Sequence, residues 1–117
     1  MRIIIDYKLD NLNETINKSR RNVYAANNAK KKEMEICKYF LKDTPKITKY
    51  PIQINCEWHV KNLNSDLDNK ILKSALDSMQ EMGILENDNI KHINEINNKA
   101  VKDNKDYLIM EVLWKKE

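Results

Sequence analysis

The stretch Ile52-Gln-Ile-Asn-Cys-Glu-Trp-His-Val60 has the clearest periodicity in the chain, because apolar and polar residues alternate along its whole length. A period of two predicts a β-strand that turns one face to a hydrophobic core and the other to polar surroundings. A single strand is not stable alone, so this stretch indicates a protein built around a β-sheet.

Weaker strand signals lie at both ends of the chain. Residues 3–7 alternate and predict an N-terminal strand, and residues 107–114 are apolar on nearly both faces, which is typical of a central strand. Three isoleucines in residues 90–96 predict a further strand. We expect the last two strands to form a hairpin across the polar residues 97–106, and we expect Trp58 and Trp114 on buried strand faces.

Two segments show helical periodicity. The first runs from about residue 20 to 41, with its first half partly loop, and the second from about residue 68 to 82. The second carries an apolar stripe at spacings of three and four, made of Leu72, Ala75, Leu76, Met79 and Met82. Gly83, the only glycine in the chain, follows directly, where a left-handed residue commonly ends a helix.

The expected order of elements is therefore β-α-β-α-β-β. This order predicts an α/β or α+β fold with a mixed sheet and about two main helices, and 117 residues fit one domain, residues 1–117. No apolar run approaches the roughly 20 residues that span a bilayer, and no signal peptide is visible, so we expect no membrane and an intracellular location. Cys37 and Cys56 stand alone, which favours ordinary buried thiols in a reducing compartment.

Positive charge is concentrated in the N-terminal half, although the net charge is only +3. No acidic residue interrupts the run of basic residues Lys18, Arg20, Arg21, Lys30, Lys31 and Lys32. A patch of this kind attracts phosphates over roughly 8 Å at physiological salt. The alternative interpretation is a solvated charged helix without a ligand.

Acidic residues of possible chemical importance lie between Asp66 and Asp88. If the backbone is extended there, the side chains of Asp66 and Asp68 point the same way and form a seat for Mg²⁺, which takes oxygen ligands. A helix and a turn that return along a hairpin-like path would bring Asp88 back to this pair. The alternative is that these residues are helix caps and turn residues, and that Lys73 is a surface lysine beside Asp77.

The segments Asp66-Leu-Asp-Asn-Lys-Ile-Leu-Lys-Ser-Ala-Leu-Asp77 and Gly83-Ile-Leu-Glu-Asn-Asp88 together resemble the core signature of RusA-type Holliday junction resolvases, in particular the phage and prophage branch. The resemblance implies that the catalytic, metal-binding acids are Asp66, Asp68 and Asp88, and that Lys73 is the catalytic lysine. One extra residue separates Asp68 from Lys73, so Lys70 is an alternative for that lysine. The acidic turn has Asn87 where the family often has a second aspartate.

The same resemblance implies a homodimeric, Mg²⁺-dependent endodeoxyribonuclease, with Mn²⁺ as an alternative ion. Such an enzyme resolves four-way junctions of branched DNA by paired symmetric nicks in recombination or repair, in the cytoplasm of a bacterial cell, its gene carried by a phage or prophage. Contacts with DNA are expected from Lys18, Arg20, Arg21, Lys30, Lys31, Lys32, Asn69 and Lys70. Two alternatives stay open: a non-catalytic DNA-binding or regulatory module, and a nuclease for other branched or single-stranded DNA.

Overall fold

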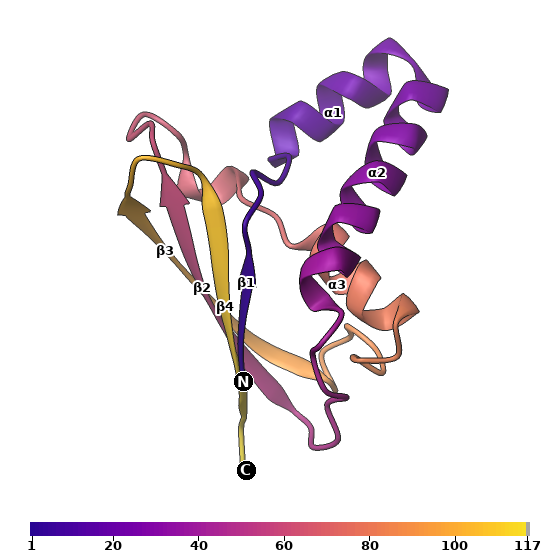
Figure 1. Ribbon diagram of the computed structural model, residues 1–117, viewed down its shortest axis with the longest axis vertical. Coiled ribbons are helices and arrows are strands. Elements are labelled where there is room, and N and C mark those ends of the chain that lie inside the picture. The colour runs from indigo at the N-terminus through magenta and orange to yellow at the C-terminus, as the bar shows by residue number, and fades with distance from the viewer. Residues whose placement is uncertain (117) are drawn as a thin grey trace.

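The structure, a computed structural model, describes residues 1–116 and has an α+β architecture. Its elements in chain order are β1 (Arg2–Ile5), α1 (Leu12–Arg21), α2 (Val23–Leu41), β2 (Ile52–Val60), the 3₁₀ helix η1 (Leu67–Asn69), α3 (Lys73–Glu81), β3 (Ile93–Lys102) and β4 (Tyr107–Trp114). All three α-helices lie on one side of a four-stranded sheet (Figure 1). The molecule is therefore a two-layer domain with one uncovered sheet face.

The sheet has the strand order β1-β4-β2-β3. β1 and β2 both pair antiparallel with β4, which confirms the predicted central position of residues 107–114. β3 pairs parallel with β2, so that Ile93 lies opposite Ile52 and Lys102 opposite Val60. A parallel pair needs a crossover connection, and here η1 and α3 provide it.

The predicted hairpin between the last two strands is wrong. β3 and β4 lie on opposite sides of β2, and residues 103–106 cross the end of β2 to join them. The backbone N–H of Asp103 donates to Val60 O (2.9 Å), and the N–H of Lys61 donates to Asp106 Oδ1 (3.2 Å). These bonds fasten the connection over the end of β2, and the polar residues expected to be the turn instead form most of β3.

The expected helix over residues 20–41 is divided into two. Asn22 interrupts it with extended backbone (φ −166°), ends α1 and caps α2. Its side-chain oxygen accepts hydrogen bonds from the N–H groups of Tyr24 (2.8 Å) and Ala25 (3.2 Å), a standard N-terminal cap. Helical structure also starts earlier than expected, at Leu12, and the domain has three α-helices where about two were expected.

α3 begins at Lys73, five residues later than expected, and ends before Gly83, whose φ of +74° confirms the predicted left-handed position. The helix-facing side of the sheet packs against α2 and α3 in one core. Its most deeply buried members include Ile5, Leu41, Ile54, Met79, Leu108 and Met110. Trp58 lies in this core, but the prediction for Trp114 is wrong, because Trp114 is 49% exposed and Lys49 lies over its ring.

Cys37 and Cys56 are both buried free thiols in this core, as expected. Burial raises the pKa of each to about 12, so both stay protonated and unreactive at neutral pH. Within residues 1–116, no helix combines the length and the apolar character that a membrane crossing requires.

Candidate nucleic-acid interface

Asp66 and Asp68 lie on a tight turn that directly follows β2. Asp66 has extended backbone (φ −88°, ψ 125°), but Asp68 lies inside the 3₁₀ turn, so the extended geometry that would align the two side chains is not present. Neither residue caps α3, whose cap position is Leu72, and Asp66 makes no capping bond to η1. Both carboxylates are exposed and have no side-chain hydrogen bond or ion pair within residues 1–116, so their oxygens are free for an external cation.

Asp88 lies at the opposite end of the sheet. Its loop packs against the start of β2, where the N–H of Glu86 donates to Tyr50 Oη (2.9 Å) and the N–H of Ile52 donates to His92 O (2.8 Å). η1 follows the other end of β2, about 30 Å away for a nine-residue strand at roughly 3.3 Å per residue. The crossover must return to the start of β2 because β3 is parallel to it, and this return carries Asp88 away from Asp66 and Asp68.

Residues 1–116 contain no group of three or more His, Cys, Asp or Glu side chains that could hold a metal ion. The single chain therefore does not assemble the three-carboxylate cluster expected from the sequence. It presents Asp66 and Asp68 close together in sequence on one turn and Asp88 on a separate, exposed loop.

Three lysines from three different helices meet at one small cavity. Lys18 on α1, Lys30 on α2 and Lys73 at the start of α3 all line a cavity of about 130 Å³. Lys70 does not line it, although Ile71, directly before α3, does. The chain after η1 thus leads from the exposed carboxylates to the cavity. Of the two lysines that the sequence left as alternatives, Lys73 lines the cavity and Lys70 does not.

Acidic partners hold these lysines in place. Asp77 Oδ2 lies 3.0 Å from Lys30 Nζ and 3.8 Å from Lys73 Nζ, so one carboxylate joins α2 and α3. Lys18 forms an ion pair with Asp10, and this hydrogen bond is the main cause of the raised pKa of Lys18. The side chains of the three lysines are between 43% and 64% exposed, so an incoming phosphate can reach them.

The cavity also touches a buried carboxylate that the sequence analysis missed. Glu33 on α2 is 9% exposed and accepts a hydrogen bond from the N–H of Asp10 (2.6 Å) and another from Ser74 Oγ (2.5 Å). Glu33 therefore ties the segment after β1 and the start of α3 to α2. A signal was present in the sequence, because Glu33 lies four and eight residues before Cys37 and Leu41, which places it on the buried face of α2.

The remaining basic residues are distributed over the surface of the two N-terminal helices. Arg20 and Arg21 end α1, Lys31 and Lys32 lie on α2, and all four are exposed without an ion pair to any residue of 1–116. Asn69 ends η1 and is half-buried, as is the following Lys70. The predicted basic run is thus divided into two groups. Lys18 and Lys30 form ion pairs with aspartates at the cavity, whereas Arg20, Arg21, Lys31 and Lys32 have no ion pair within residues 1–116.

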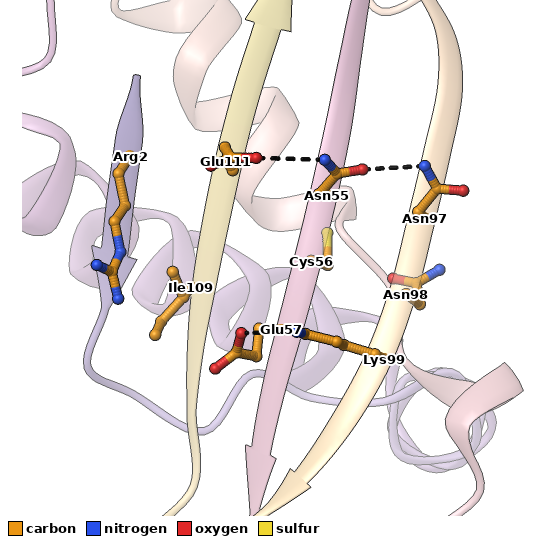
Figure 2. A pocket seen from close by; sticks show the side chains of 9 residues that line it. All are labelled: Arg2, Asn55, Cys56, Glu57, Asn97, Asn98, Lys99, Ile109 and Glu111. Carbon is orange, nitrogen blue, oxygen red and sulfur yellow. Dashed lines mark hydrogen bonds and ion pairs between the residues drawn. The ribbon is translucent and has the colours of Figure 1, made fainter.

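A second, wider cavity of about 520 Å³ lies on the uncovered face of the sheet (Figure 2). Residues from all four strands line it: Arg2, Asn55, Cys56, Glu57, Asn97, Asn98, Lys99, Ile109 and Glu111. Asn55 links its neighbours, since it donates to Glu111 Oε1 (3.4 Å) and accepts from Asn97 Nδ2 (2.9 Å). Lys99 also pairs with Glu57 (3.3 Å), so much of this face is a hydrogen-bonded polar surface.

Next to this cavity, His59 contacts two carboxylates. His59 Nε2 lies 2.7 Å from Glu57 Oε1, Nδ1 lies 2.9 Å from Asp103 Oδ2, and the ring stacks on Tyr107 at 4.1 Å. Hydrogen bonds from His59 and then Lys99 lower the pKa of Glu57. The N–H of Asn104 and then His59 lower the pKa of Asp103.

We therefore expect acid to reduce the stability that the carboxylates around His59 contribute to the fold. Because the folded-state pKa of Asp103 lies below its ordinary value of about 4, its contribution to stability is present at neutral pH. That contribution is lost as the pH falls from about 5 through the folded-state pKa. In urea unfolding at several pH values, Asp103→Asn should lose less stability between about pH 5 and 3 than the wild type does.

The matched control is Asp43→Asn, since Asp43 is exposed and its side chain has no hydrogen bond or ion pair to residues 1–116. This variant should follow the wild-type pH dependence. If the stability of Asp103→Asn fell with pH as steeply as that of the wild type, the contacts around His59 would not contribute to the acid dependence.

No protein-family model matches the chain, and no curated protein sequence matches it. Its function must therefore be argued from the chemistry of its own residues.

Proposed function

We propose that this chain is a Mg²⁺-dependent endonuclease of branched DNA that resolves four-way junctions as a homodimer. The observation that carries the proposal is the meeting of Lys18, Lys30 and Lys73 at one cavity, directly after the segment that presents Asp66 and Asp68. Residues far apart in the sequence thus bring three lysines to one cavity, and the chain enters that cavity from the turn that carries the two exposed carboxylates. Cations that neutralise phosphate charge and carboxylates that hold a metal ion are the groups that metal-dependent phosphodiester hydrolysis uses.

The carboxylates fit a hard cation. Mg²⁺ keeps several waters and usually binds through one or two protein carboxylates plus a substrate phosphate. The oxygens of Asp66 and Asp68 are exposed and unpaired within residues 1–116, so no internal partner competes for them. When bound, the ion would supply Lewis-acid catalysis and a more acidic water.

The lysines would bind and orient the DNA. The ammonium groups of Lys18 and Lys30 would hold a backbone phosphate at the cavity, and Lys73 would neutralise negative charge that develops on its oxygens. Asp77 would keep Lys30 and Lys73 in place before DNA arrives. The free basic residues on α1 and α2 would add phosphate contacts, whose strength falls steeply with salt.

Two matched nicks require two sites, and a twofold dimer would supply them with the symmetry of the substrate. Asp88 could then reach the cation only from the second copy, because its own chain holds it at the far end of the sheet. The dimer is thus part of the proposal.

The experiment is a cleavage assay on a labelled four-way junction and a linear duplex, with Mg²⁺ or with EDTA. Paired symmetric nicks on the junction alone, only with Mg²⁺, are the expected result. Cutting of flaps or single strands in preference to the junction would move the proposal to another nuclease. Binding without cutting, with Mg²⁺ and with Mn²⁺, would favour a DNA-binding module.

The two candidate lysines should behave differently. Lys73→Ala removes a cation from the cavity, so the cleavage rate should fall by about 100- to 1,000-fold, in the range for loss of one charge-stabilising donor. Lys70→Ala removes a lysine that does not line the cavity, and its rate should stay within about threefold, a small change in barrier. Single-turnover cleavage of the junction measures both, and the reverse order would place the catalytic lysine at position 70.

A further inference from the structure

The connection between α1 and α2 projects from the domain and contributes little to its core. It lies at the outer end of the helical layer, away from the sheet (Figure 1). α1 has no buried residue, and the buried residues of α2 begin only at Glu33. The packing of the domain therefore does not explain the side chains at this corner.

Two hydrophobic side chains are largely exposed at the corner. Tyr24 is 81% exposed and the adjacent Val23 is 65% exposed. The side chain of Asn22 bonds the backbone N–H of Tyr24, so the ring projects from the capped first turn of α2. A tyrosine has only two side-chain torsions to order when it binds a flat partner, so the entropy cost of such binding is small.

The charged residues nearest to Tyr24 in the sequence are all basic. Arg20 and Arg21 directly precede the corner, and Lys31 lies seven residues after Tyr24, two turns along the same face of α2. No acidic residue occurs between Glu14 and Glu33. The three cations have no ion pair within residues 1–116, so the partner that matches this surface is a polyanion.

We propose that Tyr24 stacks on an unstacked base at the branch point of DNA, while Arg20, Arg21 and Lys31 contact the flanking phosphates. Every base offers a flat face to an aromatic ring, and stacking with nearby cations is the usual way to bind bases that are not in a continuous duplex. This step rests on the proposed function for its substrate, branched DNA. It does not require that the DNA be cut.

The test is binding in EDTA, where the DNA stays intact. The probe is a four-way junction with 2-aminopurine next to the branch point, compared with a linear duplex that carries 2-aminopurine in the same sequence. Tyr24→Ala should weaken binding to the junction by about 5- to 100-fold, the range for loss of one stacking ring, and should change duplex binding little. The wild type and Tyr24→Phe should change the 2-aminopurine fluorescence, and Tyr24→Ala should not.

Tyr39→Ala is the matched control, because Tyr39 is 62% exposed at the other end of α2. It should bind both DNAs as the wild type does. Equal affinities of the wild type and Tyr24→Ala for the junction would overturn the proposal. It would also be overturned if Tyr24→Ala lost as much affinity for the duplex as for the junction, or if sedimentation showed that Tyr24→Ala changes the oligomeric state. If junction binding depends on Tyr24 but the protein does not cleave DNA with Mg²⁺, the stacking role of Tyr24 stands and the proposed nuclease activity is rejected. If the protein cleaves the junction but Tyr24→Ala binds it as tightly as the wild type, the nuclease activity stands and the stacking role is rejected.

Discussion

Asp68→Asn should abolish cleavage of a four-way junction while leaving its binding intact. The substitution keeps the size of the side chain and removes the negative charge that a cation needs. A bound metal is worth several kcal/mol of transition-state stabilisation, so the rate should fall by about 100-fold or more. Because Asp68 is exposed and has no side-chain partner within residues 1–116, the fold should not change.

Three measurements make this result specific. Cleavage rates at several Mg²⁺ concentrations show whether the ion is bound more weakly, gel-shift assays in EDTA show that DNA still binds, and urea unfolding shows that stability is unchanged. Asp43→Asn, a change of the same kind at an exposed position outside the candidate site, should cut normally. Full activity of Asp68→Asn would exclude this carboxylate from the metal site.

Asp88 allows a test of the dimer. The single chain holds Asp88 at the far end of β2 from η1, so a role for Asp88 in the same site requires two copies. If Asp68→Asn and Asp88→Asn are both inactive alone, their mixture should recover part of the activity, because a mixed dimer contains one site with all three acids. No recovery after verified subunit exchange would mean that Asp88 does not act in the site of a partner.

Glu33→Ala should destabilise the fold by about 2–4 kcal/mol, the second large effect that we expect. The substitution leaves the N–H of Asp10 and the hydroxyl of Ser74 without the acceptor that each now contacts at 2.6 and 2.5 Å. An unsatisfied buried group costs roughly 1–3 kcal/mol, and we expect the lower part of the combined range because the N–H of Asp10 is only partly buried. The free energy of unfolding from urea titration measures the loss.

The control for Glu33 lies two residues away. Glu35 is on the same helix, its side chain is 74% exposed, and its ion pair with Lys38 is long, at 3.4 Å. Glu35→Ala should therefore change stability by less than about 0.5 kcal/mol. Equal effects of the two substitutions would show that Glu33 does not join the helices to the segment after β1.

The sequence was sufficient for the elements with the clearest local periodicity. The alternation of residues 52–60 predicted β2 with its buried and polar faces, and the apolar character of residues 107–114 predicted a central strand. The left-handed Gly83 was predicted from its place after a helical stripe. In each case the direction of a side chain follows from the backbone geometry of a few neighbouring residues, so the pattern is visible in the sequence.

The corner at Asn22 shows a signal that was available but weak. Asparagine is a preferred N-cap, yet the basic and apolar residues on both sides continue without an obvious change of pattern. Only the structure shows that the chain turns there and exposes Tyr24. The buried position of Glu33 was concealed in a similar way by the run of lysines that precedes it.

The strand order and the arrangement of the candidate site were decided by the tertiary structure alone. β3 pairs with β2 and not with β4, and this one choice sends Asp88 to the far end of the sheet. The lysines at positions 18, 30 and 73 meet because α1, α2 and α3 pack against one another. Such pairings depend on contacts between residues far apart in the chain, whose energies leave no local pattern, so the sequence by itself identified the strands and the charged residues but not their final neighbours.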